Sequence, residues 1–271
     1  MNTRLQNSFA AGGCCTALFG TVLGLGLAPM AQAALVGQWT FNEGSGTVAT
    51  DTAGSNNGTL SNGASYVANG AGNYAVHFGD GSGSGTGNDS VVYPNTATFN
   101  MGQNFSIETW VKLDTNNGGV DWFFGKEHST IARYGLLVAG GQYRFDVGSY
   151  NENLPDVFAT ASTPVTVGVW DHLVGTYDGA TVKLYKNGSL AASTAWVTAG
   201  PYYPTGQWPS AGPFYYNTGS IDQAQLWNET LSGAQVLSLY QSGPIAVPEP
   251  ASAGAIISLA MVGLSSRKRR R

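Results

Sequence analysis

The chain alternates apolar and polar residues in short runs that are bounded by residues typical of turns. In residues 104–113 the alternation places Phe105, Ile107, Thr109 and Val111 on one face, and Ser106, Glu108, Trp110 and Lys112 on the other. Residues 181–186 follow the same pattern. A period of two residues is the spacing of side chains along a β-strand, so both runs are predicted to be strands.

Further strands are predicted over residues 35–41, 74–78, 134–138, 143–147, 172–177 and 220–227. The pairs Gly140-Gly141 and Asn187-Gly188 predict turns or hairpins, because their residues accept a positive φ. Only residues 232–240 have helical character, with Ser232 as the N-cap. Many short strands, one helix and no internal repeat predict an all-β sandwich rather than a propeller or solenoid.

Composition narrows the class of protein. Charged residues make up 10% of the 271 residues, aromatic residues make up 11%, and there are 38 glycines. Between residues 34 and 243 there are 6 basic and 15 acidic residues, a net charge of −9. An acidic body disfavours nucleic acid as a partner.

The N-terminal 33 residues resemble a targeting segment. Arg4 precedes an apolar run over residues 17–28, and the segment closes on Ala31-Gln32-Ala33. This order predicts a secretory signal peptide that signal peptidase cleaves after Ala33. Both cysteines, Cys14 and Cys15, lie inside it, so the predicted mature chain has no thiol.

The C-terminal residues 247–271 form a second predicted signal. Pro248-Glu249-Pro250 precedes 16 uncharged residues over 251–266, which would span about 24 Å as a helix, and five basic residues end the chain. The order resembles the PEP-CTERM sorting signal of Gram-negative bacteria. The resemblance implies that an exosortase recognises Val247, Pro248, Glu249 and Pro250 and removes the tail after transient anchoring in the inner membrane. A plain single-span anchor is the alternative.

Six segments carry a further resemblance. They are residues 35–46, 51–58, 105–112, 170–179, 184–188 and 219–227, among them Leu35-Val-Gly-Gln-Trp39 and Trp170-Asp-His-Leu-Val-Gly-Thr-Tyr-Asp-Gly179. In series they resemble a laminin G-like domain of the concanavalin A-like lectin and glucanase superfamily. This resemblance implies a jelly-roll sandwich of two curved antiparallel sheets over residues 34–243.

The large aromatic residues of these segments are predicted to pack between the sheets. They are Trp39, Phe41, Trp110, Trp170 and Trp227. His172 is predicted to be a structural residue with a buried partner, because no serine or cysteine nucleophile motif accompanies it.

Catalysis by paired carboxylates is the first chemistry to consider, because glucanases share the superfamily that the chain resembles. Their strand motif, Glu-x-Asp-x-Glu, does not occur in this sequence, and Glu108 stands alone on its predicted strand. We therefore expect a protein that is not an enzyme, with glycoside hydrolysis as the less favoured alternative.

A structural calcium ion is the second chemistry to consider. Asp51 opens a loop that is rich in oxygen ligands, and Asp222 lies on a late predicted strand. The laminin G-like resemblance implies Asp51, Asn56 and Asp222 as the calcium ligands. A turn in which the Asp51 side chain closes the loop is the alternative.

Contact between aromatic side chains and a ligand is the third chemistry to consider. Residues 201–216 hold six aromatic residues and four prolines without any charge. We interpret them as a rigid loop rather than a strand, because proline cannot donate a ladder hydrogen bond. Tyr202, Tyr203, Trp208, Tyr215 and Tyr216 are the candidates for stacking on sugar rings, and a loop folded back on the sandwich is the alternative.

Together these observations predict an exported surface or matrix protein of a Gram-negative bacterium that binds extracellular polysaccharide or another surface glycan without catalysis. A structural or adhesion protein with protein partners is the alternative. The sequence alone does not identify the ligand.

Overall fold

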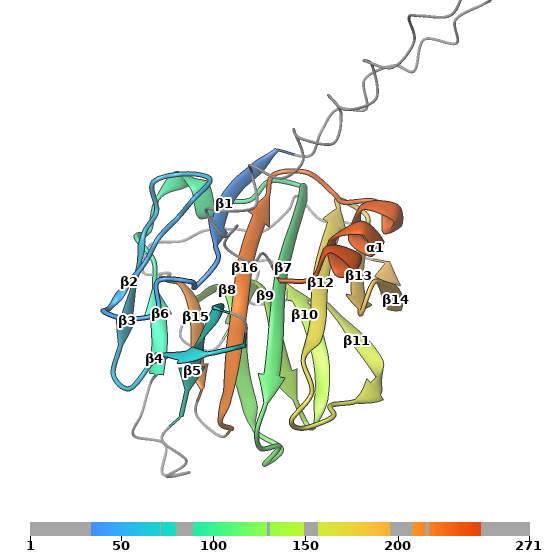
Figure 1. The fold of residues 1–271 in the computed structure, drawn as a ribbon. Coiled ribbons are helices and arrows are strands. Elements are labelled where there is room, and N and C mark those ends of the chain that lie inside the picture. Colours follow the sequence, from blue (N-terminus) through green and yellow to red (C-terminus); the bar gives the residue numbers. More distant parts are fainter. Residues whose placement is uncertain are drawn as a thin grey trace, which may run out of the picture. The chain divides into compact units, whose positions relative to one another are not determined.

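The computed structural model describes residues 34–70, 72–79, 89–128, 131–148, 157–195, 208–214 and 217–244. Within these residues the chain forms two eight-stranded antiparallel sheets, which we call sheet A and sheet B (Figure 1). The prediction of an all-β sandwich is confirmed.

Sheet A has its long central strands β7 (Asn104–Leu113) and β16 (Gly219–Trp227) side by side. Its order is β14 (Ser189–Ala195), β13 (Thr181–Lys186), β12 (Asp171–Asp178), β7, β16, β5 (Tyr74–Phe78) and β4 (Ser65–Ala68), with β1 (Leu35–Trp39) also paired to β16. The structure therefore has strands in each of the sheet A regions that alternation predicted.

Sheet B has the order β11 (Val157–Pro164), β10 (Gln142–Val147), β9 (Ile131–Ala139), β8 (Val120–His128), β15 (Trp208–Phe214), β6 (Asp89–Val92), β3 (Gly58–Ser61) and β2 (Val48–Ala49). Gly140 and Gly141, both at positive φ, form the turn between β9 and β10, and Asn187 and Gly188 form the turn between β13 and β14. Both turns confirm the sequence prediction.

The strand β15 corrects one prediction, because residues 208–214 are a strand despite Pro209 and Pro213. The strand tolerates proline because its pairing is short: it follows β8 at three positions, and a bulge interrupts its register with β6 between Ala211 and Phe214. Gly212 adopts φ 90° in that bulge. A bulge leaves residues out of the ladder, so the missing N–H of Pro213 removes little pairing, whereas Pro209 lies outside the bulge, opposite Lys126 of β8.

The main core lies between the sheets and includes Trp39, Phe41, Phe105, Tyr134 and Phe145. The faces predicted for β7 are correct, because Phe105, Ile107 and Val111 enter this core.

Three of the five predicted core aromatic residues lie elsewhere. Trp110 is on the outer face of sheet A, where its ring stacks on Tyr240 at 5.8 Å. Trp227 belongs to a smaller cluster with Val174 and Val236. Trp170 is half-buried. The prediction failed because aromatic size indicates burial but not which face of a sheet is covered.

The cover on the outer face of sheet A is helix α1 (Gly233–Ser242), seen beside β12 and β13 in Figure 1. The predicted N-cap is confirmed: the Ser232 hydroxyl accepts from the Gln235 N–H, and the Gln235 side chain accepts from the Ser232 N–H at 2.9 Å. Its buried Val236 packs against the smaller cluster. No helix of the described residues is long and apolar enough to cross a membrane.

Candidate functional site

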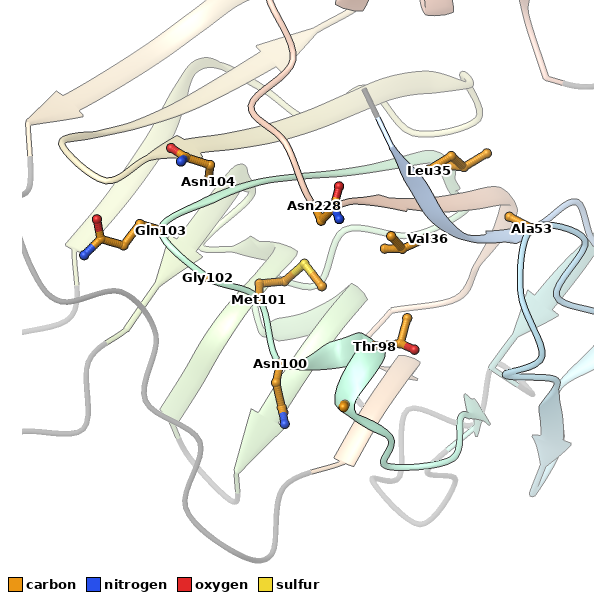
Figure 2. Close-up of a pocket in the computed structure, with 11 residues that line it drawn as sticks. Leu35, Val36, Ala53, Thr98, Asn100, Met101, Gly102, Gln103, Asn104 and Asn228 are labelled. Carbon is orange, nitrogen blue, oxygen red and sulfur yellow. The ribbon is translucent and has the colours of Figure 1, made fainter. Parts of the chain in front are cut away.

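A pocket of about 690 Å³ opens at one end of the strands of sheet A (Figure 2). One wall is the segment 97–104, which runs from the short 3-10 helix η1 (Ala97–Phe99) into β7. The facing wall contains Leu35 and Val36 of β1, Ala53 and Asn228. Gln103 and Asn104 lie at one end of the pocket in Figure 2, and Leu35 and Ala53 lie at the other.

The lining of this pocket is rich in amides and carries no charged side chain. Thr98, Asn100, Gln103, Asn104 and Asn228 supply hydroxyl and amide groups. They meet because β7 begins at Asn104 and the antiparallel β16 ends at Trp227, which pairs with Ser106. The start of β7 and the end of β16 therefore lie at the same end of sheet A.

The segment 97–104 is held in place from inside the sandwich. The Tyr134 hydroxyl donates to the Phe99 carbonyl at 3.0 Å, and the Phe99 ring stacks on Trp39 at 5.8 Å. The Lys126 ammonium donates to Asn100 Oδ1 at 2.6 Å. Lys126 is only 2% exposed, and burial lowers the pKa of its ammonium to about 8.

The facing wall depends on the loop that begins at Asp51. Asp51 Oδ1 accepts from the N–H groups of Gln38, Ala53 and Gly54 at 2.9–3.1 Å. Asp51 Oδ2 accepts from the backbone N–H of Asn56 at 3.0 Å and from its side chain at 3.3 Å. This buried carboxylate folds the loop around itself, and Ala53 lines the pocket as a result.

The two walls are joined through Asn56. Its Nδ2 donates to Thr98 Oγ1 at 3.4 Å, and its Oδ1 accepts from the Thr96 hydroxyl at 2.6 Å. Its carbonyl accepts from the Trp39 indole N–H at 3.0 Å.

The structure brings together two of the three predicted calcium ligands. Asp51 and Asn56 share the loop, whereas Asp222 accepts a hydrogen bond from Asn69 at 2.7 Å on β16. N–H donors already face both Asp51 oxygens, an arrangement that suits an anion and opposes a cation. Among the described residues no group of three or more His, Cys, Asp or Glu side chains could hold a metal ion. These three residues do not fit a calcium ion in this arrangement.

Asp222 has its own unusual environment. It lies beside a bulge of β16, where Gln223 adopts φ 55°, and it is 1% exposed. Burial raises the pKa of its carboxyl to about 7, against the opposing hydrogen bonds from Asn69 and the Gln223 backbone. Its Oδ1 has no hydrogen-bond partner in the described part of the chain.

The sequence predicts a buried partner for His172, and the structure shows that this partner is Glu108. His172 Nε2 lies 2.7 Å from Glu108 Oε1, and both side chains are fully buried. The Trp110 ring is tilted against His172 at 4.9 Å, and the Tyr240 ring stacks on it at 5.9 Å. Glu108 and Asp222 lie on neighbouring strands, but they are 0% and 1% exposed and do not line the pocket.

The remaining candidate side chains lie outside the described residues. These are the aromatic side chains Tyr202, Tyr203, Trp208, Tyr215 and Tyr216, and the sorting residues Val247, Pro248, Glu249 and Pro250. Only the backbone of Trp208 is described, paired with Glu127 at the start of β15.

Sequence reasoning missed the amides of the pocket and the buried Lys126. Each amide is unremarkable in the sequence, and the signal lies in the pairing of β7 with β16. If β7 and β16 are paired as antiparallel neighbours in the register of the structure, Asn104 and Asn228 lie at the same end of the sheet.

Comparison with known proteins places the chain in a family. Residues 82–237, more than half of the chain, match the sequence model of the laminin G-type family described as the concanavalin A-like lectin/glucanases superfamily. The chain belongs to this superfamily, as its motifs indicated. No curated protein matches the sequence.

Solved structures share the fold at low identity. The binding domain of Paraclostridial Mosquitocidal Protein 1 has a TM-score of 0.60 at 13% identity, over 77% of this chain and 52% of that chain. Trypanosoma rangeli sialidase in complex with sialic acid has a TM-score of 0.55 at 18% identity, over 78% of this chain and 33% of that chain. A third structure is Domain 4 of AbnA, a GH43 extracellular arabinanase from Geobacillus stearothermophilus, in complex with arabinotriose. It has a TM-score of 0.56 at 19% identity, over 78% of this chain and 100% of that chain.

The chain thus spans about half of the toxin domain and a third of the sialidase, but the full length of the arabinanase domain. At these identities the likeness is one of fold alone.

Proposed function

We propose that the protein is an exported carbohydrate-binding protein without catalytic activity, and that the amide-lined pocket holds the sugar. The observation that carries this proposal is the lining itself: hydroxyl and amide groups from Thr98, Asn100, Gln103, Asn104 and Asn228, and no charge. A side-chain amide both donates and accepts hydrogen bonds, as a sugar hydroxyl does.

The size and the apolar floor of the pocket support a saccharide. A volume of about 690 Å³ falls within the range of small-molecule sites. Val36 and Met101 offer apolar surface to the C–H faces of a sugar ring. The arabinanase domain in complex with arabinotriose, which has this fold over its whole length, supports the same ligand class.

Export is proposed from the two ends of the sequence. Residues 1–33 serve as a signal peptide for signal peptidase, and residues 247–271 as a PEP-CTERM signal for an exosortase. The protein then reaches the cell surface or the extracellular matrix of a Gram-negative bacterium, where extracellular polysaccharide is the proposed ligand. The aromatic residues of 201–216 remain a second proposed contact for that polysaccharide.

The absence of catalysis is proposed from the carboxylates. Glu108 and Asp222, the two on neighbouring central strands, are buried side chains of sheet A. A glycosidase needs its two carboxyl groups on either side of a bound glycosidic bond.

A matrix or adhesion role with a protein partner is the alternative, and one observation favours it. Leu190, Leu237 and Tyr240 are 54%, 42% and 36% exposed where β14 and α1 adjoin. Exposed apolar side chains that adjoin mark surfaces for other proteins.

A glycan-array screen of the purified protein, including the host's own polysaccharide, tests the proposal. The double variant Asn104→Ala/Asn228→Ala removes two exposed amides of the pocket, and we expect it to bind at least tenfold more weakly, because each lost hydrogen bond contributes about 1 kcal/mol. The control Gln241→Ala removes an exposed amide of α1 that does not line the pocket. Binding that is equal in both variants would sink the pocket as the site.

A further inference from the structure

Lys126 of β8 is a cation placed inside the sandwich. It is 2% exposed, and its ammonium donates to Asn100 Oδ1 at 2.6 Å. Burying an ammonium costs more than burying an apolar side chain of the same length. Methionine at this position could not donate the hydrogen bond to Asn100.

The hydrogen bond determines how Asn100 faces the pocket. An ammonium can only donate, so the carbonyl oxygen of Asn100 is the group that faces Lys126. Its Nδ2, with two donors, is left at the free end of the side chain, which points away from Met101 in Figure 2. Asn100 is an exposed residue of the lining, so these donors are open to solvent at the Asn100 end of the pocket.

The charge behind Asn100 strengthens these donors. A cation on the oxygen side of an amide polarises it and makes its N–H groups better partners for an anion. The net charge of −9 over residues 34–243 opposes an anion at long range, but the lining of the pocket adds no acidic side chain that would repel it at contact.

We propose that the part of the pocket beside Asn100 takes a sugar that bears a carboxylate, such as a uronic acid residue of an acidic polysaccharide. The carboxylate accepts from Asn100 Nδ2, and Lys126 lies behind the amide as the positioning and polarising residue. This inference rests on the proposed function and names the class of sugar for the same pocket.

The experiment compares acidic sugars with their neutral forms. The probes are oligogalacturonate, oligoglucuronate and sialylated oligosaccharides, each printed on one array as the free acid and as the methyl ester. We expect the whole protein to bind the acid of its preferred sugar about tenfold more tightly than the ester, the size typical of one charge-assisted hydrogen bond. Equal or tighter binding of the esters overturns the inference and leaves the proposed function standing. Binding of no glycan overturns both.

Two variants separate the charge of Lys126 from its hydrogen bond. Lys126→Gln keeps a donor for Asn100 and removes the charge, whereas Lys126→Met removes both. We expect Lys126→Gln to lose the preference for the acid, so that it binds the acid and the ester with the same affinity. A variant that weakens acid and ester equally, at an unchanged melting temperature, shows that Lys126 only orients Asn100 and overturns the electrostatic part.

Discussion

Replacing Asp222 with asparagine should make the fold more stable above neutral pH and leave it unchanged in acid. Asp222 is 1% exposed, and burial raises the pKa of its carboxyl from 3.8 to about 7. Between these two values the folded protein holds a proton that the unfolded chain has released. The free energy of unfolding contributed by this group therefore falls as the pH rises from about 4 to about 7.

The magnitude follows from the shift. Each pKa unit is worth about 1.4 kcal/mol, so a shift of about three units costs the native state up to about 4 kcal/mol at pH 8. Asparagine does not titrate, and its Oδ1 can still accept from Asn69, which donates to Asp222 at 2.7 Å. We expect Asp222→Asn to match the wild type at pH 4 and to exceed it by about 2 to 4 kcal/mol at pH 8.

The assay is urea unfolding followed by tryptophan fluorescence at pH 4, 5, 6, 7 and 8. Asp178→Asn is the control of opposite sign. Burial raises the pKa of Asp178, but the N–H groups of Ala180 and Thr181 and the ammonium of Lys183 outweigh it, so that the pKa lies below its usual value. Its stabilisation is present above the unfolded pKa and is lost only as the pH falls below about 4, so we expect Asp178→Asn to be less stable than the wild type from pH 5 to pH 8. A difference between Asp222→Asn and wild type that is the same at pH 4 and pH 8 would refute the reasoning.

Two further predictions concern the support of the fold. Asp51→Ala removes the acceptor of five N–H contacts in a buried loop, so we expect the free energy of unfolding in urea to fall by about 3 kcal/mol. Because these donors hold the carboxylate without a cation, a chelator should leave the melting temperature of the wild type unchanged. A lower melting temperature with chelator would restore the calcium hypothesis. Gly175→Ala places a Cβ 2.4 Å from the Phe145 ring between the sheets, so we expect calorimetry to show a free energy of unfolding lower by about 1 to 3 kcal/mol. An unchanged stability would contradict this and show that the core repacks around the methyl group.

Local patterns in the sequence predicted a large part of the fold. Residues 181–186 are β13 as predicted, and the Ser232 cap begins α1. Alternation succeeds at β7 because one face of that strand enters the core while the other bears Glu108 and Trp110.

The pocket could not be predicted in the same way, because it depends on contacts distant in sequence. Asn104 and Asn228 meet only through the register of β7 with β16, and Asn100 is oriented by Lys126 from the other sheet. Alternation predicts the correct face for Trp110, opposite Phe105, but its size predicts a place between the sheets, because the sequence does not show that α1 covers the outer face of sheet A. Likewise, the sequence does not show the bulge in which β15 holds Pro213.

The central claim is that the amide-lined pocket binds a saccharide, and titration calorimetry with the best glycan of the array tests it most directly. We predict one saturable site on the wild type and on Gln241→Ala, and affinity at least tenfold weaker for Asn104→Ala/Asn228→Ala at the same melting temperature. Undiminished affinity in that double variant would contradict the account and move the binding site away from the pocket.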